Sequence, residues 1–327
     1  MGITFALVFV GSLIVVANWV EKQGNELIDR FFTWVLLAYN LPAFLLGLIL
    51  LTVPNSQIAA AMQLDPGQIN FPALGTWLVL MAIWGSLIAL PGVRHFLARR
   101  SPTLNPDSAV HATALLLVGY LVGNTLATLS QGGLEGLAST AEQATLLDVF
   151  SSQFLFAAVA LLGVGIFIRR PGKAVRERLG LERPTRAQLL TGVVAILVLV
   201  VAQAVAGAIW GLVDPQQAQL LDDISSTLLG DINTVGEWFL LAAATGIGEE
   251  LLFRGALQPI FGVTATSLIF AIAHVQYGIT PVTLFVFFLA LVLGFIRHRT
   301  NTTTTMFVHF GYNFTLGLLA LLAASLP

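Results

Sequence analysis

The chain has 327 residues, of which 57% are hydrophobic and 10% charged, and its mean hydropathy is +0.87. A water-soluble domain cannot bury this much apolar surface, so the composition indicates an integral membrane protein. The net charge of -2 provides no concentrated basic face, and no nucleic-acid partner is expected. The absence of cysteine excludes thiol catalysis, disulfides and thiolate metal sites.

Apolar runs of about twenty residues, the length that crosses the hydrocarbon core as a helix, recur along the chain. They predict an all-α fold, a polytopic transmembrane helix bundle of about ten spans. The predicted spans cover residues 3–20, 32–53, 71–90, 109–129, 147–168, 188–213, 236–258, 263–275, 281–296 and 304–326. The eighth is short, which is typical of a tilted, neighbour-buried or re-entrant segment.

Basic residues alternate between the predicted connections. Lys and Arg fall in the first, third, fifth and ninth loops and near the seventh, whereas the second, fourth and sixth loops hold only acidic charges. Cytoplasmic loops carry the excess of Lys and Arg, so the alternation supports the span count and predicts that both termini face outward.

The basic stretch 169–186 separates five N-terminal spans from five C-terminal ones. We interpret it as an orientation-setting loop with a short amphipathic surface helix, and a site for anionic lipid or a partner is the alternative. It predicts a boundary between an N-terminal membrane region, residues 1–170, to which the sequence assigns no role, and a C-terminal region, residues 171–327.

Polar and ionisable side chains gather in the C-terminal spans. The segments "GIGEELLFR", "FAIAH" and "HFGYN" supply Glu249, Glu250, Arg254, His274, His309 and Asn313. Ionisable groups inside a span cost a few kcal/mol on insertion scales and mark functional sites by default. At a rise of 1.5 Å per residue, Glu249, His274 and His309 lie roughly 12 to 17 Å from the predicted cytoplasmic ends. This common depth near the bilayer midplane predicts one shared site.

Helical spacing separates the two adjacent glutamates. Residues four apart share a helix face, so Glu250 can pair with Arg254, while Glu249 points about 100° away. We therefore predict that Glu249 takes part in chemistry. His309 and Asn313 also share a face and can point into one cavity.

These residue types suit hydrolysis of an amide by water. A carboxylate away from bulk water can act as general base with help from an imidazole, and Asn and a second His can donate hydrogen bonds to an oxyanion. Metal-assisted hydrolysis is the alternative, with His274, His309 and Glu249 binding Zn²⁺ and leaving one position for water. The sequence does not choose between the two.

The segments "EELLFR", "FAIAH" and "HFGYN" resemble the EExxxR, FxxxH and HxxxN motifs of the CPBP intramembrane proteases, which include type II CAAX prenyl endopeptidases and bacterial Abi proteins. The resemblance covers about residues 184–326. It implies that Glu249 and His274 activate water, that His309 and Asn313 stabilise the oxyanion, and that Glu250 and Arg254 support the site. It further implies that residues 171–327 form the protease domain, with the site open to the cytosol.

The resemblance also sets the expected surroundings of the protein. It implies a multi-pass location in the bacterial plasma membrane, with the lipid bilayer and a membrane-associated peptide or protein substrate as partners. CAAX-type and bacteriocin- or immunity-type processing both fit the family. The first 170 residues have no counterpart in its core.

Other interpretations of the same residues stay open. Glu250 and Arg254 could form an ion pair with a purely structural role. The side chains of His274, His309 and Asn313 could equally form hydrogen bonds between helices. At the level of the whole protein, the alternatives are a non-catalytic membrane scaffold or regulator and a proton-coupled transporter. No evident repeat relates the two halves, which weakens the transporter hypothesis.

Overall fold

The structure, a computed structural model, describes residues 2–65 and 67–325. Helices account for 82% of it, and the described residues contain no β-strand, which confirms the predicted all-α fold. Eight described helices are long and apolar enough to cross a membrane. The chain is therefore a multi-pass integral membrane protein.

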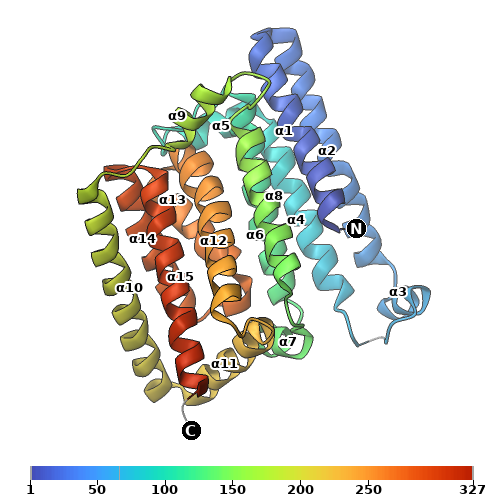
Figure 1. The fold of residues 1–327 in the computed structure, drawn as a ribbon. Coiled ribbons are helices and arrows are strands. Elements are labelled where there is room, and N and C mark those ends of the chain that lie inside the picture. Colours follow the sequence, from blue (N-terminus) through green and yellow to red (C-terminus); the bar gives the residue numbers. More distant parts are fainter. Residues whose placement is uncertain (1, 66, 326–327) are drawn as a thin grey trace. The chain divides into compact units, whose positions relative to one another are not determined.

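Helices follow one another along the whole described chain (Figure 1). In order they are α1 (Gly2–Gln23), α2 (Glu26–Thr52), α3 (Asn55–Met62), α4 (Phe71–Ala89), α5 (Pro91–Ala98), α6 (Ala109–Leu129), α7 (Gly133–Thr140), α8 (Leu146–Gly163), α9 (Gly172–Leu179), α10 (Arg186–Val213), α11 (Pro215–Leu229), α12 (Val235–Glu250), the π-helix η1 (Leu251–Leu257), α13 (Gln258–Ala273), the 3₁₀-helix η2 (Val275–Tyr277), α14 (Pro281–Arg299) and α15 (Thr302–Ser325).

Two features account for the difference between about ten predicted spans and eight candidate spans. The seventh and eighth predicted spans form one helical stretch, Val235–Ala273, in which Gly262 leaves the helical conformation at φ 77° and ψ 176°. A straight helix of 39 residues would measure about 58 Å, nearly twice the hydrocarbon thickness. The first predicted span lies in α1, and the side chains of residues 2–6 fall outside the described part of the structure.

Contacts divide the chain into two compact units. The N-terminal unit comprises Ala17–Thr140 and Ile272–Gly278, and the C-terminal unit comprises Met1–Val16, Ala141–Ala271 and Ile279–Pro327. Helix α8 therefore packs with the later helices. The functional boundary expected near residue 170 stays a prediction, because compactness does not define function.

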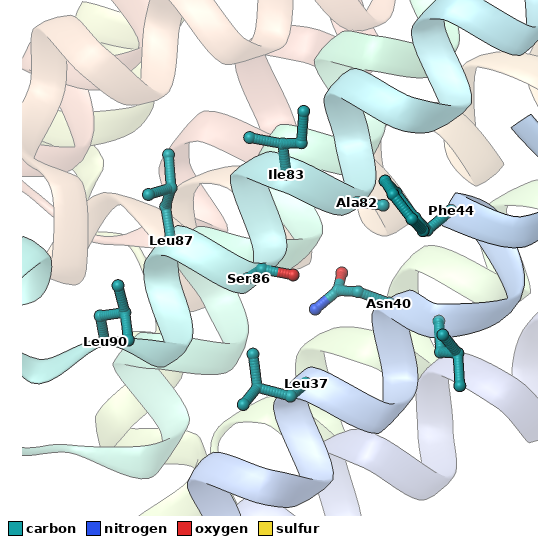
Figure 2. Close-up of a pocket in the computed structure, with 9 residues that line it drawn as sticks. Leu37, Asn40, Phe44, Ala82, Ile83, Ser86, Leu87 and Leu90 are labelled. Carbon is teal, nitrogen blue, oxygen red and sulfur yellow. The ribbon is translucent and has the colours of Figure 1, made fainter. Parts of the chain in front are cut away.

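In the N-terminal unit, α2 and α4 approach closely where Gly47 meets Gly75. A Cβ on either glycine would lie 2.8 Å from the carbonyl oxygen of the other, so no larger residue fits at this crossing. Nearby, the buried Asn40 accepts a hydrogen bond from the Tyr120 hydroxyl at 2.9 Å. Figure 2 shows Asn40 and Ser86 as the polar groups of an otherwise apolar pocket of about 410 Å³ between these helices. The pocket contains none of the predicted site residues.

In the C-terminal unit, α12 packs against α8 and α15 (Figure 1). Helix α10 packs against α14 and α15 and exposes an apolar face along its length, including Leu190, Val194, Leu197 and Val201. Such a face suits lipid, which does not require polar side chains on the outer surface of a span. Helix α12, which carries the two glutamates, is thus enclosed between two other helices of the unit.

Candidate active site

The adjacent glutamates Glu249 and Glu250 are the last two residues of α12. Both are buried, with exposed fractions of 8% and 0%. The helix continues beyond them as η1, a seven-residue π-helix with wider turns. Stretches of π-helix inside α-helices occur frequently at functional sites. The backbone therefore changes its geometry directly after the two carboxylates.

The surface helix α9 supports this π-helix through Arg178. The guanidinium donates hydrogen bonds to the carbonyl oxygens of Gly255 and Ala256, at 2.9 and 3.4 Å. Burial, with smaller contributions from the neighbouring Arg170, Arg297 and Arg169, lowers the pKa of Arg178 to about 10, so the side chain is still protonated at neutral pH. The charged guanidinium thus links α9 to the backbone of η1 through two charge-assisted hydrogen bonds.

Replacement of Arg178 by methionine is expected to destabilise the protein by about 1.5–3 kcal/mol, because two buried carbonyls lose a charged donor. Thermal unfolding of the purified protein in detergent measures the loss. Arg178→Lys keeps the positive charge but loses the paired donors of the guanidinium. Its unfolding temperature should lie between those of the wild type and Arg178→Met. Unfolding of Arg178→Met at the wild-type temperature would contradict this role of Arg178.

Glu250 forms an ion pair with Arg254 inside the unit. Arg254 Nε lies 3.4 Å from Glu250 Oε2, and both side chains are fully buried. The guanidinium carbon also lies 4.9 Å from the centre of the Phe270 ring, in a cation–π contact. The pair is the one that the four-residue spacing predicts. It neutralises one of the two adjacent carboxylates.

His309, from α15, lies between the two glutamates. Its Nδ1 is 3.0 Å from Glu250 Oε1, within hydrogen-bond distance, and its Nε2 is 4.0 Å from Glu249 Oε2. The imidazole has an exposed fraction of 5%. Each ring nitrogen therefore faces a different carboxylate. The sequence predicted a shared site for Glu249, His274 and His309, and the structure brings Glu249 and His309 together.

Glu249 has a further neighbour on α8. The side-chain amide of Gln153 donates a hydrogen bond from Nε2 to Glu249 Oε1 at 3.3 Å, and Gln153 is buried. Carboxylates are strong acceptors, so this contact fixes one oxygen of Glu249. The other oxygen faces His309.

Two glycines allow α8 and α15 to approach the glutamates. A Cβ on Gly246 would lie 3.0 Å from the backbone nitrogen of Phe310 on α15, and a Cβ on Gly248 would lie 2.8 Å from the backbone oxygen of Gln153 on α8. Real Cβ atoms rarely come this close to backbone atoms. The sequence "GIGEE" therefore combines the two carboxylates with the close packing that brings His309 and Gln153 to them.

Replacement of Gly246 by valine is expected to separate α12 from α15, to cost about 1–3 kcal/mol of stability, and to lower any activity that requires His309. Thermal unfolding and activity assays measure both effects. Gly236→Val is the matched control, because a Cβ on Gly236 of the same helix meets nothing within 4 Å. Equal effects of the two substitutions would show that the close packing at Gly246 is unimportant.

Asn313 lies one turn after His309 on α15. Its Nδ2 donates to the Thr245 hydroxyl at 3.0 Å, and that hydroxyl donates in turn to the Leu241 carbonyl at 3.0 Å. The amide is thus anchored to α12, one turn before Glu249. The shared face of His309 and Asn313 that the sequence predicts is present, and both side chains contact α12.

His274 lies between α13 and η2, directly before the first residue of η2, and its ring stacks on Tyr277 with centroids 6.1 Å apart. It belongs to the N-terminal unit, whose placement relative to the C-terminal unit is not determined. The structure therefore brings Glu249, Glu250, Arg254, His309 and Asn313 together and does not place His274 with them. Within residues 2–65 and 67–325, no group of three or more His, Asp or Glu side chains is arranged to hold a metal ion.

Gln153 and Thr245 contact the site and are not among the residues that the sequence predicted. Gln153 gave a general signal, because an amide inside a predicted span needs a hydrogen-bond partner, commonly on another helix. Its partner on α12 is 96 residues away, and helical spacing reveals only partners within one helix. Thr245 gave no signal, because threonine in a span usually bonds its own backbone.

The C-terminal unit thus holds a buried carboxylate, Glu249, beside an imidazole and an amide donor. The second carboxylate, on Glu250, is matched by Arg254, which leaves the pair neutral. A carboxylate and an imidazole in contact can exchange protons with water, which is the requirement for general acid–base chemistry. These features define a multi-pass membrane protein with a buried Glu–His site.

Residues 231–315 match the family model described as "Type II CAAX prenyl endopeptidase Rce1-like". This segment is about a quarter of the chain and extends from the approach to α12 into α15. It includes all six predicted site residues and excludes Gln153. The match confirms the predicted resemblance to the CPBP intramembrane proteases. The chain has no significant match among the curated proteins or the solved structures.

Proposed function

We propose that this protein is an intramembrane endopeptidase that hydrolyses a peptide bond with water activated at Glu249. The observation that carries the proposal is the placement of Glu249 between the Gln153 amide and the His309 imidazole, while Arg254 neutralises Glu250. The family match supports the same class of activity. The basic loops on one side support a site reached from the cytosol.

In the proposed reaction, Glu249 takes a proton from water and the water oxygen bonds to the scissile carbonyl carbon. The carbon–nitrogen bond then breaks, and the proton passes to the leaving amine. A protonated His309 donates through Nδ1 to Glu250 and offers its Nε2 proton to the oxyanion, with the Asn313 amide as a second donor. The family resemblance assigns His274 to water activation beside Glu249.

The substrate class follows from the description of the matching family, which acts on prenylated CAAX sequences. We expect the protein to cleave the C-terminal segment of a prenylated, membrane-associated peptide. Bacteriocin- or immunity-type processing of an unmodified membrane peptide is the alternative. The two differ in whether the substrate needs a prenyl group.

The test uses the full-length protein in proteoliposomes and a farnesylated CAAX peptide with a fluorophore and a quencher on either side of the scissile bond. The proposal expects release of fluorescence by the wild type and none by Glu249→Gln. The same peptide without its farnesyl group separates the two substrate classes. Equal cleavage by wild type and Glu249→Gln would refute the role of Glu249, and no cleavage of either peptide by the wild type would favour a scaffold or regulator.

The metal-assisted alternative needs a measurement of its own. If Glu249, His274 and His309 bind Zn²⁺, elemental analysis of the purified protein should find close to one zinc per chain, and His309→Ala should lose it. If a carboxylate and an imidazole act without metal, the protein should retain its cleavage rate after dialysis against a chelator. Zinc content and activity after chelation thus distinguish metal-assisted hydrolysis from hydrolysis by a carboxylate and an imidazole, and both mechanisms are compatible with the proposed function.

A further inference from the structure

We propose that Gln153 is a positioning residue that holds Glu249 in its reactive orientation, an inference that rests on the proposed function. Gln153 lies on α8, outside the segment that matches the family model. The inference thus adds to the protease site a residue from the helices that precede the matched segment.

Gln153 contacts Glu249 directly. Gln153 Nε2 donates to Glu249 Oε1 at 3.3 Å, and the exposed fractions of the two residues are 9% and 8%. The contact bridges two helices, so it restrains the carboxylate relative to α8 and not only within α12. A general base must stay within hydrogen-bond distance of the water that it deprotonates, which requires a fixed carboxylate.

Helix α8 packs closely against α12 and η1 on either side of this contact. Gly248 of α12 packs against the backbone of Gln153, where a Cβ would lie 2.8 Å from its carbonyl oxygen. One turn further along α8, Phe156 contacts Phe253 of η1 edge to face, with ring centroids 6.1 Å apart. The packing at Gly248 fixes the backbone of Gln153 itself, whereas the ring pair lies one turn away and stabilises the packing of α8.

The side-chain amide of Gln153 is a neutral hydrogen-bond donor. A neutral amide donates to a carboxylate without neutralising it, whereas the Arg254 guanidinium neutralises Glu250. The two adjacent glutamates therefore differ in their nearest partners: Glu250 Oε2 faces the Arg254 guanidinium at 3.4 Å, whereas Glu249 Oε1 accepts from the neutral Gln153 amide at 3.3 Å, with His309 at 4.0 Å from its other oxygen. The neutral donor orients Glu249 and leaves its charge available for proton transfer.

The experiment compares Gln153→Met, which keeps the length of the side chain and removes the donor, with Phe156→Leu on the same helix. Both are assayed with the farnesylated peptide in proteoliposomes, and thermal unfolding is measured in parallel. Gln153→Met is expected to lower kcat by about 10- to 100-fold with KM within about twofold of wild type, because the misplaced carboxylate affects the reaction and not substrate binding. Phe156→Leu is expected to lower the unfolding temperature and to keep kcat.

Three outcomes would overturn either the positioning role of Gln153 or the proposed function, and each can be told apart from the others. Wild-type kcat in Gln153→Met, with Glu249→Gln inactive, refutes the positioning role and leaves the proposed function standing. A fall in kcat that Phe156→Leu reproduces, together with an equal fall in unfolding temperature, shows that Gln153 is only structural. Full activity of Glu249→Gln refutes the proposed function itself, whatever Gln153→Met does.

Discussion

Replacement of Glu249 by glutamine is expected to lower kcat by roughly 10²- to 10⁴-fold, the usual contribution of a general base. Glutamine has nearly the same shape and can still contact Gln153 and His309, so the fold should persist. The amide cannot accept a proton from water at neutral pH. The rate of peptide cleavage in proteoliposomes measures the effect, and the unfolding temperature should stay close to that of the wild type.

Glu250→Gln is the matched control for this prediction. It makes the same change, from carboxylate to amide, at the neighbouring residue. Unlike Glu249→Gln, it leaves the fully buried Arg254 without the carboxylate of its ion pair. We therefore expect Glu250→Gln to lower the unfolding temperature, whereas Glu249→Gln lowers kcat at nearly constant stability. If Glu249→Gln lowered the unfolding temperature and Glu250→Gln lowered kcat at nearly constant stability, Glu250 and not Glu249 would be the general base.

Replacement of Arg254 by methionine is expected to destabilise the protein by about 3–5 kcal/mol, because the buried carboxylate of Glu250 loses its cation. The cation–π contact with Phe270 is lost as well. The site should then be disordered, and cleavage should fall with the folded fraction. Thermal unfolding in detergent measures the loss of stability directly.

The double variant Glu250→Gln/Arg254→Met tests whether the charge itself causes the loss. It removes both charges, so most of the lost stability should return. If the double variant unfolded as early as Arg254→Met alone, the packing of the guanidinium against Phe270 would matter more than its charge. This comparison does not depend on the identity of the substrate.

The contacts at the two glutamates show which side-chain contacts helical spacing can predict and which it cannot. The spacing of Glu250 and Arg254 predicts their ion pair, because both belong to one continuous helical stretch. The same rule separates Glu249 from Glu250 but gives Glu249 no partner. Its partners Gln153 and His309 come from α8 and α15, 96 and 60 residues away along the chain. Such contacts depend on how helices pack, and no periodicity in the sequence encodes them.

The number of membrane spans is likewise only partly predictable from the sequence. The apolar runs predicted the membrane helices closely, because the thickness of the hydrocarbon core sets the length of a span. They did not reveal that Val235–Ala273 is one helical stretch interrupted at Gly262, nor that the backbone widens into a π-helix after Glu250. Hydropathy reports which residues prefer lipid and is insensitive to backbone geometry.

The sequence by itself determined the class of the protein, the positions of its membrane helices and the set of polar residues in its C-terminal spans. These follow from composition and spacing, which are local properties of the chain. Only the tertiary structure decided which neighbour each glutamate has: Arg254 for Glu250, and Gln153 with His309 for Glu249. The physical reason is close helix packing at Gly246 and Gly248, which brings distant residues to the two carboxylates.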